Sequence, residues 1–400
     1  ELDIDNDLSK SFIEKISSSV EHRKMGDPVR FVYDKSIGRD TLAFLKEKMN
    51  IEDTDSVIPG GRYHNRRDYM GFPSLGRKDL LYEKIIPLPV KGLSVEGSIL
   101  ESIAKKDYMQ YTPYHTFTYI LKFLREAALD PKVRTIKITV YRLASNSQVA
   151  ASLINAVKNG KQVTVQIELQ ARFDEQANIE YAEQLQAEGV KLIFGVPGLK
   201  VHSKICLIER EEGHEIKRYG FISTGNFNES TARIYTDYTL FTAYDPILKE
   251  LNKVFDFFET TYKINKYKHL IVSPHYTKNA FMKLIDVEIA NAILGKEAYI
   301  KIKMNSFTSY KMVDKLYEAS RAGADWMTRN LDYRVEVGCP IYDEDIKKEL
   351  MDTFEICWKD NMKARVFNEK QDNAYRKTTV PRIRSQFATY EYYAKDVKKK

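Results

Sequence analysis

Apolar and polar positions alternate between helix-like and strand-like spacing over much of the chain. The helical spacing of apolar residues predicts helices at residues 117–129, 149–158, 174–188 and 246–260. Runs rich in β-branched residues predict strands at residues 135–141, 162–169, 190–194, 201–208 and 219–223. Helix-stopping glycines, Gly160 and Gly189, follow two of these helices. Such alternation predicts an α/β fold with a largely parallel sheet.

The first hundred residues follow a different pattern. They predict a helix at 7–20, a strand at 28–33 and a helix at 41–50, followed by turns rich in glycine and proline. We therefore expect a smaller α+β domain over residues 1–105. The α/β pattern then predicts a first catalytic-type domain over residues 106–265 and a second over residues 266–400.

The second α/β domain is predicted because the chain repeats itself. Matching residues lie 164 positions apart (Lys137-Ile138 and Lys301-Ile302), then 163 apart (Leu153, Ala156, Gly160 and Leu316, Ala319, Gly323), then only 99 apart (Phe227, Asp237 and Trp326, Glu336). The fall from 163 to 99 means that the second copy lacks 64 residues that the first copy has. We expect the second domain to be incomplete between Gly323 and Asp325, with a break in the chain there.

Composition excludes several classes of protein. Hydrophobic residues make up 43% and charged residues 30%, which is the balance of a globular chain rather than a disordered or fibrous one. No run of 18 apolar residues predicts a membrane span. The three cysteines, Cys206, Cys339 and Cys357, form neither a disulfide framework nor a zinc pattern and suit a reducing compartment. The chain opens on Glu1 without an export leader, so we expect a trimmed or partly recorded product.

The net charge of +7 is concentrated at the C-terminal end of the sequence. Residues 361–400 hold eleven Lys/Arg and four Asp/Glu, so this stretch accounts for the whole net charge. Aromatic residues, among them Tyr375, Phe387 and Tyr390, are interleaved with the basic ones. The basic end is a candidate contact for a polyanion; the alternative is a solvated tail.

One short motif combines a nucleophile with a cation. His202-Ser203-Lys204 lies in a predicted strand, where the period of two places His202 and Lys204 on the same face. Downstream, the turn at residues 223–228 contains two amides, Asn226 and Asn228. A neutral imidazole is available near pH 7 and a lysine supplies positive charge, so the group suits chemistry at phosphorus.

Two arginines follow predicted strands. Arg142 ends the first strand and Arg172 follows the second, and ligands of open α/β sheets bind at the carboxyl ends of strands. Arg172 has an alternative interpretation as the ion-pair partner of Asp174 or Glu175, whereas Arg142 has no acid nearby in sequence. Asp237 is a candidate to orient an imidazole or to bind Arg233.

H-x-K followed by a G-x-N turn in a duplicated α/β domain resembles the phospholipase D superfamily, although Glu209 stands where that superfamily has Asp. Further strings resemble polyphosphate kinases of the His-dependent type, from about Asp27 to the end of the chain. These strings are residues 137–142, 168–175, 198–204, 224–228, 231–237, 303–306, 325–331 and 384–386. From this resemblance we expect the family's N-terminal helical domain to be missing from this sequence, and the family's second catalytic histidine to fall inside the inferred 64-residue gap.

The resemblance implies a fold of two tandem phospholipase D-like α/β domains after a smaller α+β domain. It also implies reversible transfer of the ATP γ-phosphoryl group to inorganic polyphosphate through a phosphohistidine. Its implied site has catalytic residues His202, Lys204 and Asn226, nucleotide or phosphate contacts Tyr235, Asn228, Lys200 and Arg233, and Mg²⁺-phosphate positions Arg142 and Arg172. Because a guanidinium cannot ligate a cation, we interpret the two arginines as phosphate clamps beside Mg²⁺.

The expected partners are ATP, ADP and polyphosphate, with no nucleic acid and with further copies of the chain in a homo-oligomer. The expected location is the cytoplasm, with peripheral attachment to a membrane left open. Two other function classes also stay open: a phosphodiesterase or nuclease of the phospholipase D type, and a non-catalytic polyanion-binding module. Glu209 and the arginine pair favour the phosphotransferase, since transfer between polyanions needs several cations around the reacting oxygens.

Overall fold

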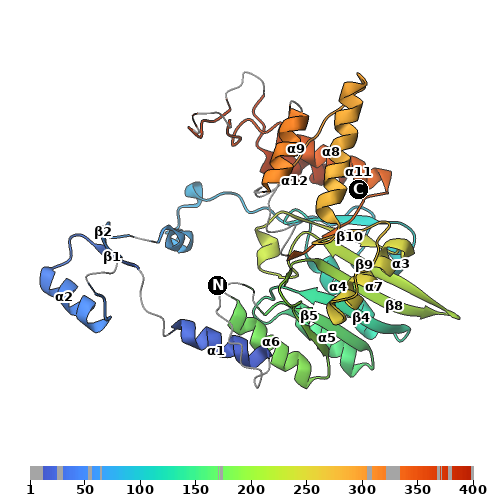
Figure 1. Ribbon diagram of the computed structural model, residues 1–400, viewed down its shortest axis with the longest axis horizontal. Helices are drawn as coiled ribbons and strands as arrows, with labels where there is room; N and C mark the ends of the chain where they lie inside the picture. Colours follow the sequence, from blue (N-terminus) through green and yellow to red (C-terminus); the bar gives the residue numbers. More distant parts are fainter. Residues whose placement is uncertain are drawn as a thin grey trace. The chain divides into compact units, whose positions relative to one another are not determined.

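The chain divides into two compact units, residues 1–85 and 86–400. The computed structural model describes residues 12–24, 30–52, 56–63, 65–169, 171, 174–303, 309–320, 334–366, 370, 372–376 and 381–397. In the first unit, β1 and β2 form a parallel two-stranded sheet (Figure 1). Its elements are α1 (Phe12–Lys24), β1 (Arg30–Asp34), α2 (Arg39–Lys48), β2 (Ser56–Gly60), η1 (Arg66–Gly71) and η2 (Lys78–Leu80).

The second unit is built on one seven-stranded sheet with the strand order β3-β10-β9-β8-β4-β5-β6. Its strands are β3 (Tyr108–Thr112), β4 (Val133–Val140), β5 (Gln162–Ile167), β6 (Lys191–Phe194), β8 (Lys204–Glu212), β9 (Glu215–Ser223) and β10 (Asp237–Thr242). The helices of this half are α3 (Ile99–Ile103), α4 (Thr118–Leu129), α5 (Gln148–Lys158), α6 (Glu175–Ala187) and α7 (Asp245–Glu259), with the short η3 (Thr231–Arg233). The predicted α/β fold class is confirmed.

The prediction of a largely parallel sheet is wrong. Only β4, β5 and β6 run parallel, while β3, β10, β9, β8 and β4 pair antiparallel. The reason lies in the connections: α5 and α6 supply the crossovers that parallel strands need, whereas β8 and β9 are joined by a tight hairpin at Gly213. Hydrophobic periodicity reports which face of a strand is buried and not its direction.

Helices cover the two faces of this sheet. On one face, Phe123 of α4 contacts Phe221 of β9, with ring centroids 5.1 Å apart. On the other face, the apolar side of α7 packs on β8 and β9 in a buried cluster that includes Phe255, Ile205 and Ile222. The strand pair β8–β9 is therefore clamped between two helices, and its N-terminal end carries the His202 segment.

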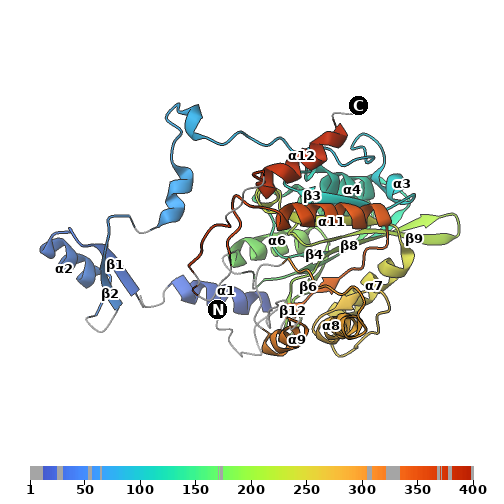
Figure 2. The same cartoon turned by 90° about the horizontal axis from the view of Figure 1, so that it is seen from above.

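The C-terminal half repeats part of this architecture. Its elements are β11 (Ile271–Val272), α8 (Thr277–Ile293), α9 (Tyr310–Ser320), β12 (Arg334–Val335), β13 (Val337–Gly338), α11 (Glu344–Trp358) and α12 (Ser385–Val397). Figures 1 and 2 show α8 and α9 side by side in this half. The predicted break at Gly323–Asp325 lies outside the described residues.

The repeat extends to strand register. Tyr238 pairs with Tyr111 in the first copy, and Val337 pairs with Val272 in the second. Val337 lies 99 residues after Tyr238, and Val272 lies 161 residues after Tyr111, so the same ladder is built twice. Helix α11 likewise lies 99 residues after α7 at both ends.

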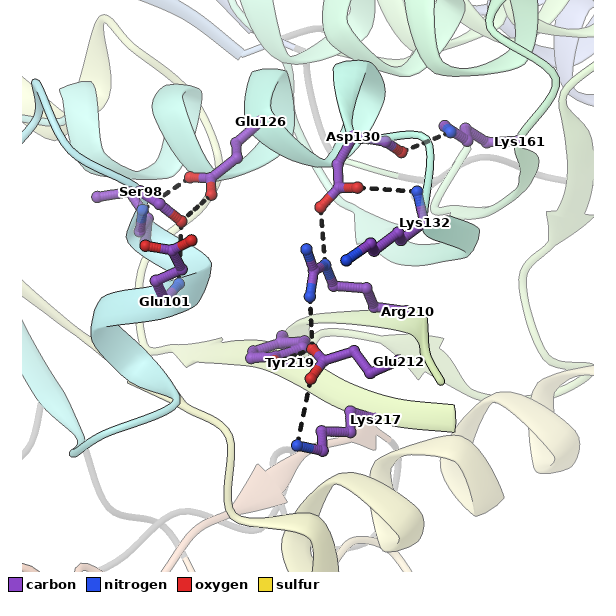
Figure 3. A network of polar contacts seen from close by, with 11 residues as sticks. Ser98, Glu101, Glu126, Asp130, Lys132, Lys161, Arg210, Glu212, Lys217 and Tyr219 are labelled. Atoms are coloured by element: carbon purple, nitrogen blue, oxygen red, sulfur yellow. Dashed lines mark hydrogen bonds and ion pairs between the residues drawn. The ribbon is translucent and has the colours of Figure 1, made fainter. Parts of the chain in front are cut away.

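A polar network fixes the far end of the β8–β9 hairpin (Figure 3). Arg210 donates to Asp130 at 2.7 Å and to Glu212 at 2.6 Å. Tyr219 also donates to Glu212, and Lys161 donates to the carbonyl of Asp130. Because these charged groups are mostly buried and bind one another, they hold the hairpin against the end of α4.

None of the helices within the described residues combines the length and apolar character that crossing a membrane requires.

Candidate active site

His202 lies at a break between two strands. β7 (Lys200–Val201) ends just before it and β8 begins at Lys204, so the strand predicted over residues 201–208 is interrupted. The backbone N–H groups of His202 and Ser203 both donate to the carbonyl of Val335, at 3.0 and 2.9 Å. The C-terminal half therefore holds these two residues outside the regular ladder, and His202 is not itself in a strand, although its ring and Lys204 both lie against the ring of Tyr141.

The imidazole of His202 is held by a carboxylate from the other half. Nδ1 of His202 lies 2.8 Å from Oε1 of Glu336, which stands between β12 and β13. A carboxylate only accepts, so Nδ1 carries the proton and the lone pair stays on Nε2. Burial lowers the pKa of His202, while the bond to Glu336 opposes that change. The result is a neutral imidazole in a fixed tautomer.

Lys204 is a buried cation next to this imidazole. Its Nζ donates to the carbonyl oxygen of His202 and lies 5.1 Å from the ring centre of Tyr141. The same Tyr141 ring meets the His202 ring edge to face at 5.0 Å. Burial lowers the pKa of Lys204 to about 7. The lysine is thus poised to become fully charged when an anion enters the site.

Arg142 reaches the same region but has a partner that its sequence neighbours do not reveal. Its Nε lies 2.8 Å from Oδ2 of Asp174, and its guanidinium lies 5.5 Å from the centre of the Tyr141 ring. Both side chains of the ion pair remain partly exposed. The acid proposed as an alternative partner of Arg172 therefore binds Arg142, and Arg172 itself lies outside the described residues.

The turn after β9 is tightly packed against β10. Thr224 donates to Asp237 at 2.8 Å, and a Cβ placed on Gly225 would lie 2.4 Å from Cγ of Asp237. Only glycine fits this approach. Burial raises the pKa of Asp237, whereas the nearby charge of Lys204 lowers it. Asp237 does not orient His202, since Glu336 does so.

The two amides of this turn differ in their surroundings. The buried Oδ1 of Asn226 has no hydrogen-bond partner among the residues that the structure describes. By contrast, Oδ1 of Asn228 accepts from the backbone N–H groups of Ser230 and Thr231, both at 3.0 Å. The side-chain oxygen of Asn228 therefore stabilises the turn, whereas the buried side-chain oxygen of Asn226 is free to accept a hydrogen bond.

The other residues that the sequence placed at the site lie farther out. Tyr235 is 63% exposed, and Arg233 is exposed on the same loop. Lys200 is half-buried in β7, where it pairs in register with Arg334 of β12. Glu209 lies in β8 and binds Arg218 at 3.0 Å, roughly 16 Å along the strand from Lys204. It belongs to the structural end of the hairpin and not to the site.

Two residues of this group, Glu336 and Tyr141, were not among the site residues expected from the sequence. The signal for Glu336 was present, because the repeat matches it to Asp237. What the repeat did not reveal is that an acid of one copy serves the histidine of the other. Tyr141 carried no signal, because a tyrosine at a strand end is common in any sheet.

The described residues contain no group of three or more His, Cys, Asp or Glu side chains that could hold a metal ion. The cations gathered around His202 are Lys204, Arg142 and Arg334, which repel metals and attract phosphate. The donor set therefore does not fit a metal held by the protein alone; it fits a polyanion.

Comparisons with known proteins agree on one family. Residues 98–264 match polyphosphate kinase C-terminal domain 1, residues 270–324 and 322–386 match C-terminal domain 2, and residues 1–72 match the polyphosphate kinase middle domain. The match to C-terminal domain 2 is thus interrupted at residues 322–324.

Individual relatives carry the same name. Polyphosphate kinase of Vibrio parahaemolyticus is 41% identical over 453 residues, covering 98% of this chain and 64% of the relative. The enzyme of Escherichia coli K12 is 38% identical, with 98% and 65% covered. The crystal structure of polyphosphate kinase from Porphyromonas gingivalis superposes with a TM-score of 0.81 at 30% identity, covering 93% of this chain and 66% of that chain. This chain spans just under two thirds of the length of these relatives.

Proposed function

Because the chain belongs to the polyphosphate kinase family, we propose that its His202 site transfers a phosphoryl group between ATP and inorganic polyphosphate. The observation that carries the proposal is the neutral imidazole of His202, fixed through Nδ1 by Glu336 and flanked by the buried cation Lys204. A nucleophile of this kind needs its Nε2 lone pair directed at the substrate and positive charge beside it.

The proposed reaction has two steps through one covalent intermediate. Nε2 of His202 attacks the γ-phosphorus of ATP, the P–N bond forms, and the bond from that phosphorus to the β–γ bridging oxygen breaks, so that ADP leaves. A terminal oxygen of polyphosphate then attacks the same phosphorus, and the P–N bond breaks. The polymer gains one phosphoryl group and His202 returns to its neutral form. Each step is reversible, so ADP can also be charged from polyphosphate.

The neighbouring residues have distinct proposed roles. Glu336 stabilises the positive charge that develops on the imidazole as the P–N bond forms. Lys204 and Asn226 bind non-bridging phosphoryl oxygens, and entry of the anion raises the fraction of Lys204 that is charged. Arg142 binds phosphate as a fork while keeping or exchanging its ion pair with Asp174.

Residues farther from His202 also have proposed roles in binding the substrates. Tyr235, Arg233 and Lys200 bind the nucleotide or the incoming chain, Asn228 holds the turn that carries Asn226, and Arg172 joins Arg142 at the phosphates. The described residues do not form a metal site by themselves, so Mg²⁺ would be supplied together with the nucleotide and would neutralise part of its phosphate charge beside Arg142 and Lys204. We further propose a homo-oligomeric, cytoplasmic enzyme without a nucleic-acid partner, in keeping with three free thiols.

The test is covalent labelling of the chain with γ-labelled ATP, Mg²⁺ and polyphosphate. His202→Ala should abolish an acid-labile, alkali-stable label, whereas two exposed control changes, His214→Ala and His275→Ala, should keep it. If His202→Ala incorporates label at a near-normal rate, the nucleophile is wrongly assigned. Cleavage of a simple phosphodiester that depends on His202, without label from ATP, would instead favour the phospholipase D-type alternative.

A further inference from the structure

The ring of Tyr141 is a common neighbour of three groups of the candidate site. Nζ of Lys204 lies 5.1 Å from the centre of this ring, and the guanidinium of Arg142 lies 5.5 Å from it. The imidazole of His202 meets the ring edge to face, with ring centres 5.0 Å apart and an angle of 83° between the two planes. Because one ring lies against all three groups, its position influences how they are placed relative to one another.

The backbone that carries this ring is itself held in place. Asn178 of α6 is 1% exposed, and its side-chain N–H₂ group donates to the carbonyl oxygens of Tyr141 and Glu168, both at 2.9 Å. Tyr141 follows β4 and Glu168 follows β5, so one buried amide joins the ends of two neighbouring strands. Burial also raises the pKa of the Tyr141 hydroxyl group, so the ring stays uncharged near neutral pH.

A ring in this position stabilises a buried ammonium group. The face of an aromatic ring carries partial negative charge and attracts a cation within about 6 Å of the ring centre, most strongly where water is excluded. Lys204 is 5% exposed, so its ammonium group has lost most of its hydration. Burial is the largest cause of its low pKa of about 7. The ring of Tyr141 therefore opposes the effect of burial on Lys204.

Charged groups from the elements around Lys204 also act on its ammonium group. Glu336, between β12 and β13, and Asp237 of β10 raise the pKa of Lys204. Arg334 of β12 and Arg142, which follows β4, lower it. Two carboxylates are thus set against two guanidinium groups. A substitution that removes only the aromatic ring leaves these four charges in the chain, so its effect on the lysine reports the ring.

We propose that Tyr141 is a positioning residue of the phosphoryl-transfer site, and that its aromatic ring, rather than its hydroxyl group, holds the ammonium group of Lys204 beside the imidazole of His202. This inference rests on the proposed function, because it assigns a task within that reaction. A charged Lys204 neutralises phosphoryl oxygens while Nε2 of His202 approaches the phosphorus. Tyr141 acts through these two side chains and makes no bond to the reacting atoms.

The test compares Tyr141→Phe and Tyr141→Leu in the full chain. Phenylalanine keeps the ring and removes only the hydroxyl group, whereas leucine removes the ring and stays apolar. The rate of labelling by γ-labelled ATP, at ATP concentrations well below saturation, is measured at pH 6 and pH 8. Tyr141→Leu should lower this rate about three- to tenfold at pH 8 but less than about twofold at pH 6, because a weaker cation–π contact lowers the pKa of Lys204. Tyr141→Phe should keep the pH dependence of the wild-type chain.

A second measurement follows Lys204 directly. In a ¹³C NMR titration of the lysine side chains, the Lys204 signal is identified by its absence from Lys204→Met. Its midpoint should move to lower pH in Tyr141→Leu and stay in place in Tyr141→Phe. The control is Tyr244→Leu, which removes a 42% exposed ring that meets another histidine, His269, edge to face at 5.9 Å. This control should leave the labelling rate within about twofold of wild type at both pH values.

Three results would overturn the inference: a loss in Tyr141→Phe as large as in Tyr141→Leu, an equal loss at pH 6 and pH 8 with an unmoved Lys204 midpoint, or no loss in Tyr141→Leu. If Tyr141→Leu does not fold, Tyr141→Met carries the same comparison. Failure of the proposed function is distinguishable, because the label would then not depend on His202. The NMR comparison still decides in that case whether the ring holds Lys204.

Discussion

Glu336→Gln isolates the contribution of the one acid that holds His202. The substitution keeps the shape of the side chain and removes its charge from an atom 2.8 Å from Nδ1. The two side chains are 29% and 27% exposed, so solvent screens the pair only in part. The amide can also present its N–H₂ group to Nδ1, which would favour the tautomer with the proton on Nε2 and block the attacking lone pair.

The magnitude follows from the type of bond lost. A hydrogen bond to a charged group contributes about 1.5–3 kcal/mol net, and partial exposure places this one near about 1.5 kcal/mol. That loss in the transition state lowers the rate of phosphoryl capture by about tenfold, and the tautomer change adds to it. The pKa of His202 should fall further, because the bond that raises it is gone while burial remains.

Two measurements check this. The first is the rate of label incorporation from γ-labelled ATP. The second is an NMR titration of the histidine ring protons, with His115 as internal reference, since burial lowers its pKa to about 4 without a contribution from Glu336. The control is Glu344→Gln at an exposed glutamate in the first turn of α11. A labelling rate within twofold of wild type, with an unmoved His202 titration, would refute the positioning role.

Three further predictions concern stability and binding. Burial lowers the pKa of Lys204 from 10.5 in the unfolded chain to about 7 in the folded protein. Between these two pH values the unfolded chain binds one proton more than the folded protein, so the free energy of unfolding rises as the pH rises from about 7 to 10.5. Lys204→Met should remove up to about 1.4 kcal/mol of that rise per pH unit in urea unfolding, and parallel wild-type and mutant profiles would contradict the buried charge. Gly225→Ala should lower the free energy of unfolding by about 1–3 kcal/mol, because the new Cβ would clash with Asp237. The control Gly97→Ala places its Cβ 4.0 Å from the nearest atom and should change the free energy of unfolding by less than about 0.5 kcal/mol. Equal urea midpoints for the two variants would contradict the predicted clash. The affinity for polyphosphate should fall as the salt concentration rises. Neutralising the basic end should make the plot of log affinity against log salt concentration less steep, by on the order of 0.7 per contacting side chain. An unchanged slope would mean that the basic end is a solvated tail. The residues to neutralise together are Arg376, Arg382 and Arg384.

The sequence by itself determined the local elements and the duplication. The four helices predicted between residues 117 and 260 lie within one residue of their expected bounds, since burial of one face imposes a regular period on the chain. The strands were predicted less completely: the one expected at 201–208 is divided into β7 and β8, and β10 was not predicted. The drop in repeat offset located an interruption that the family match also shows at residues 322–324. His202 and Lys204 were recognisable as candidates because one short motif contains both the proposed nucleophile and a neighbouring cation.

Only the tertiary structure decided how those elements serve one another. β8 and β9 run antiparallel because a hairpin connects them, and the spacing of apolar residues does not reveal the direction in which a strand runs. The pairing of Arg142 with Asp174 joins residues 32 positions apart, and that of His202 with Glu336 joins residues 134 positions apart. The depressed pKa of Lys204 arises from burial under elements of both halves. Charge, tautomer and pKa at a site depend on what packs around it, and packing between two copies of a repeat is a property of neither copy's sequence alone.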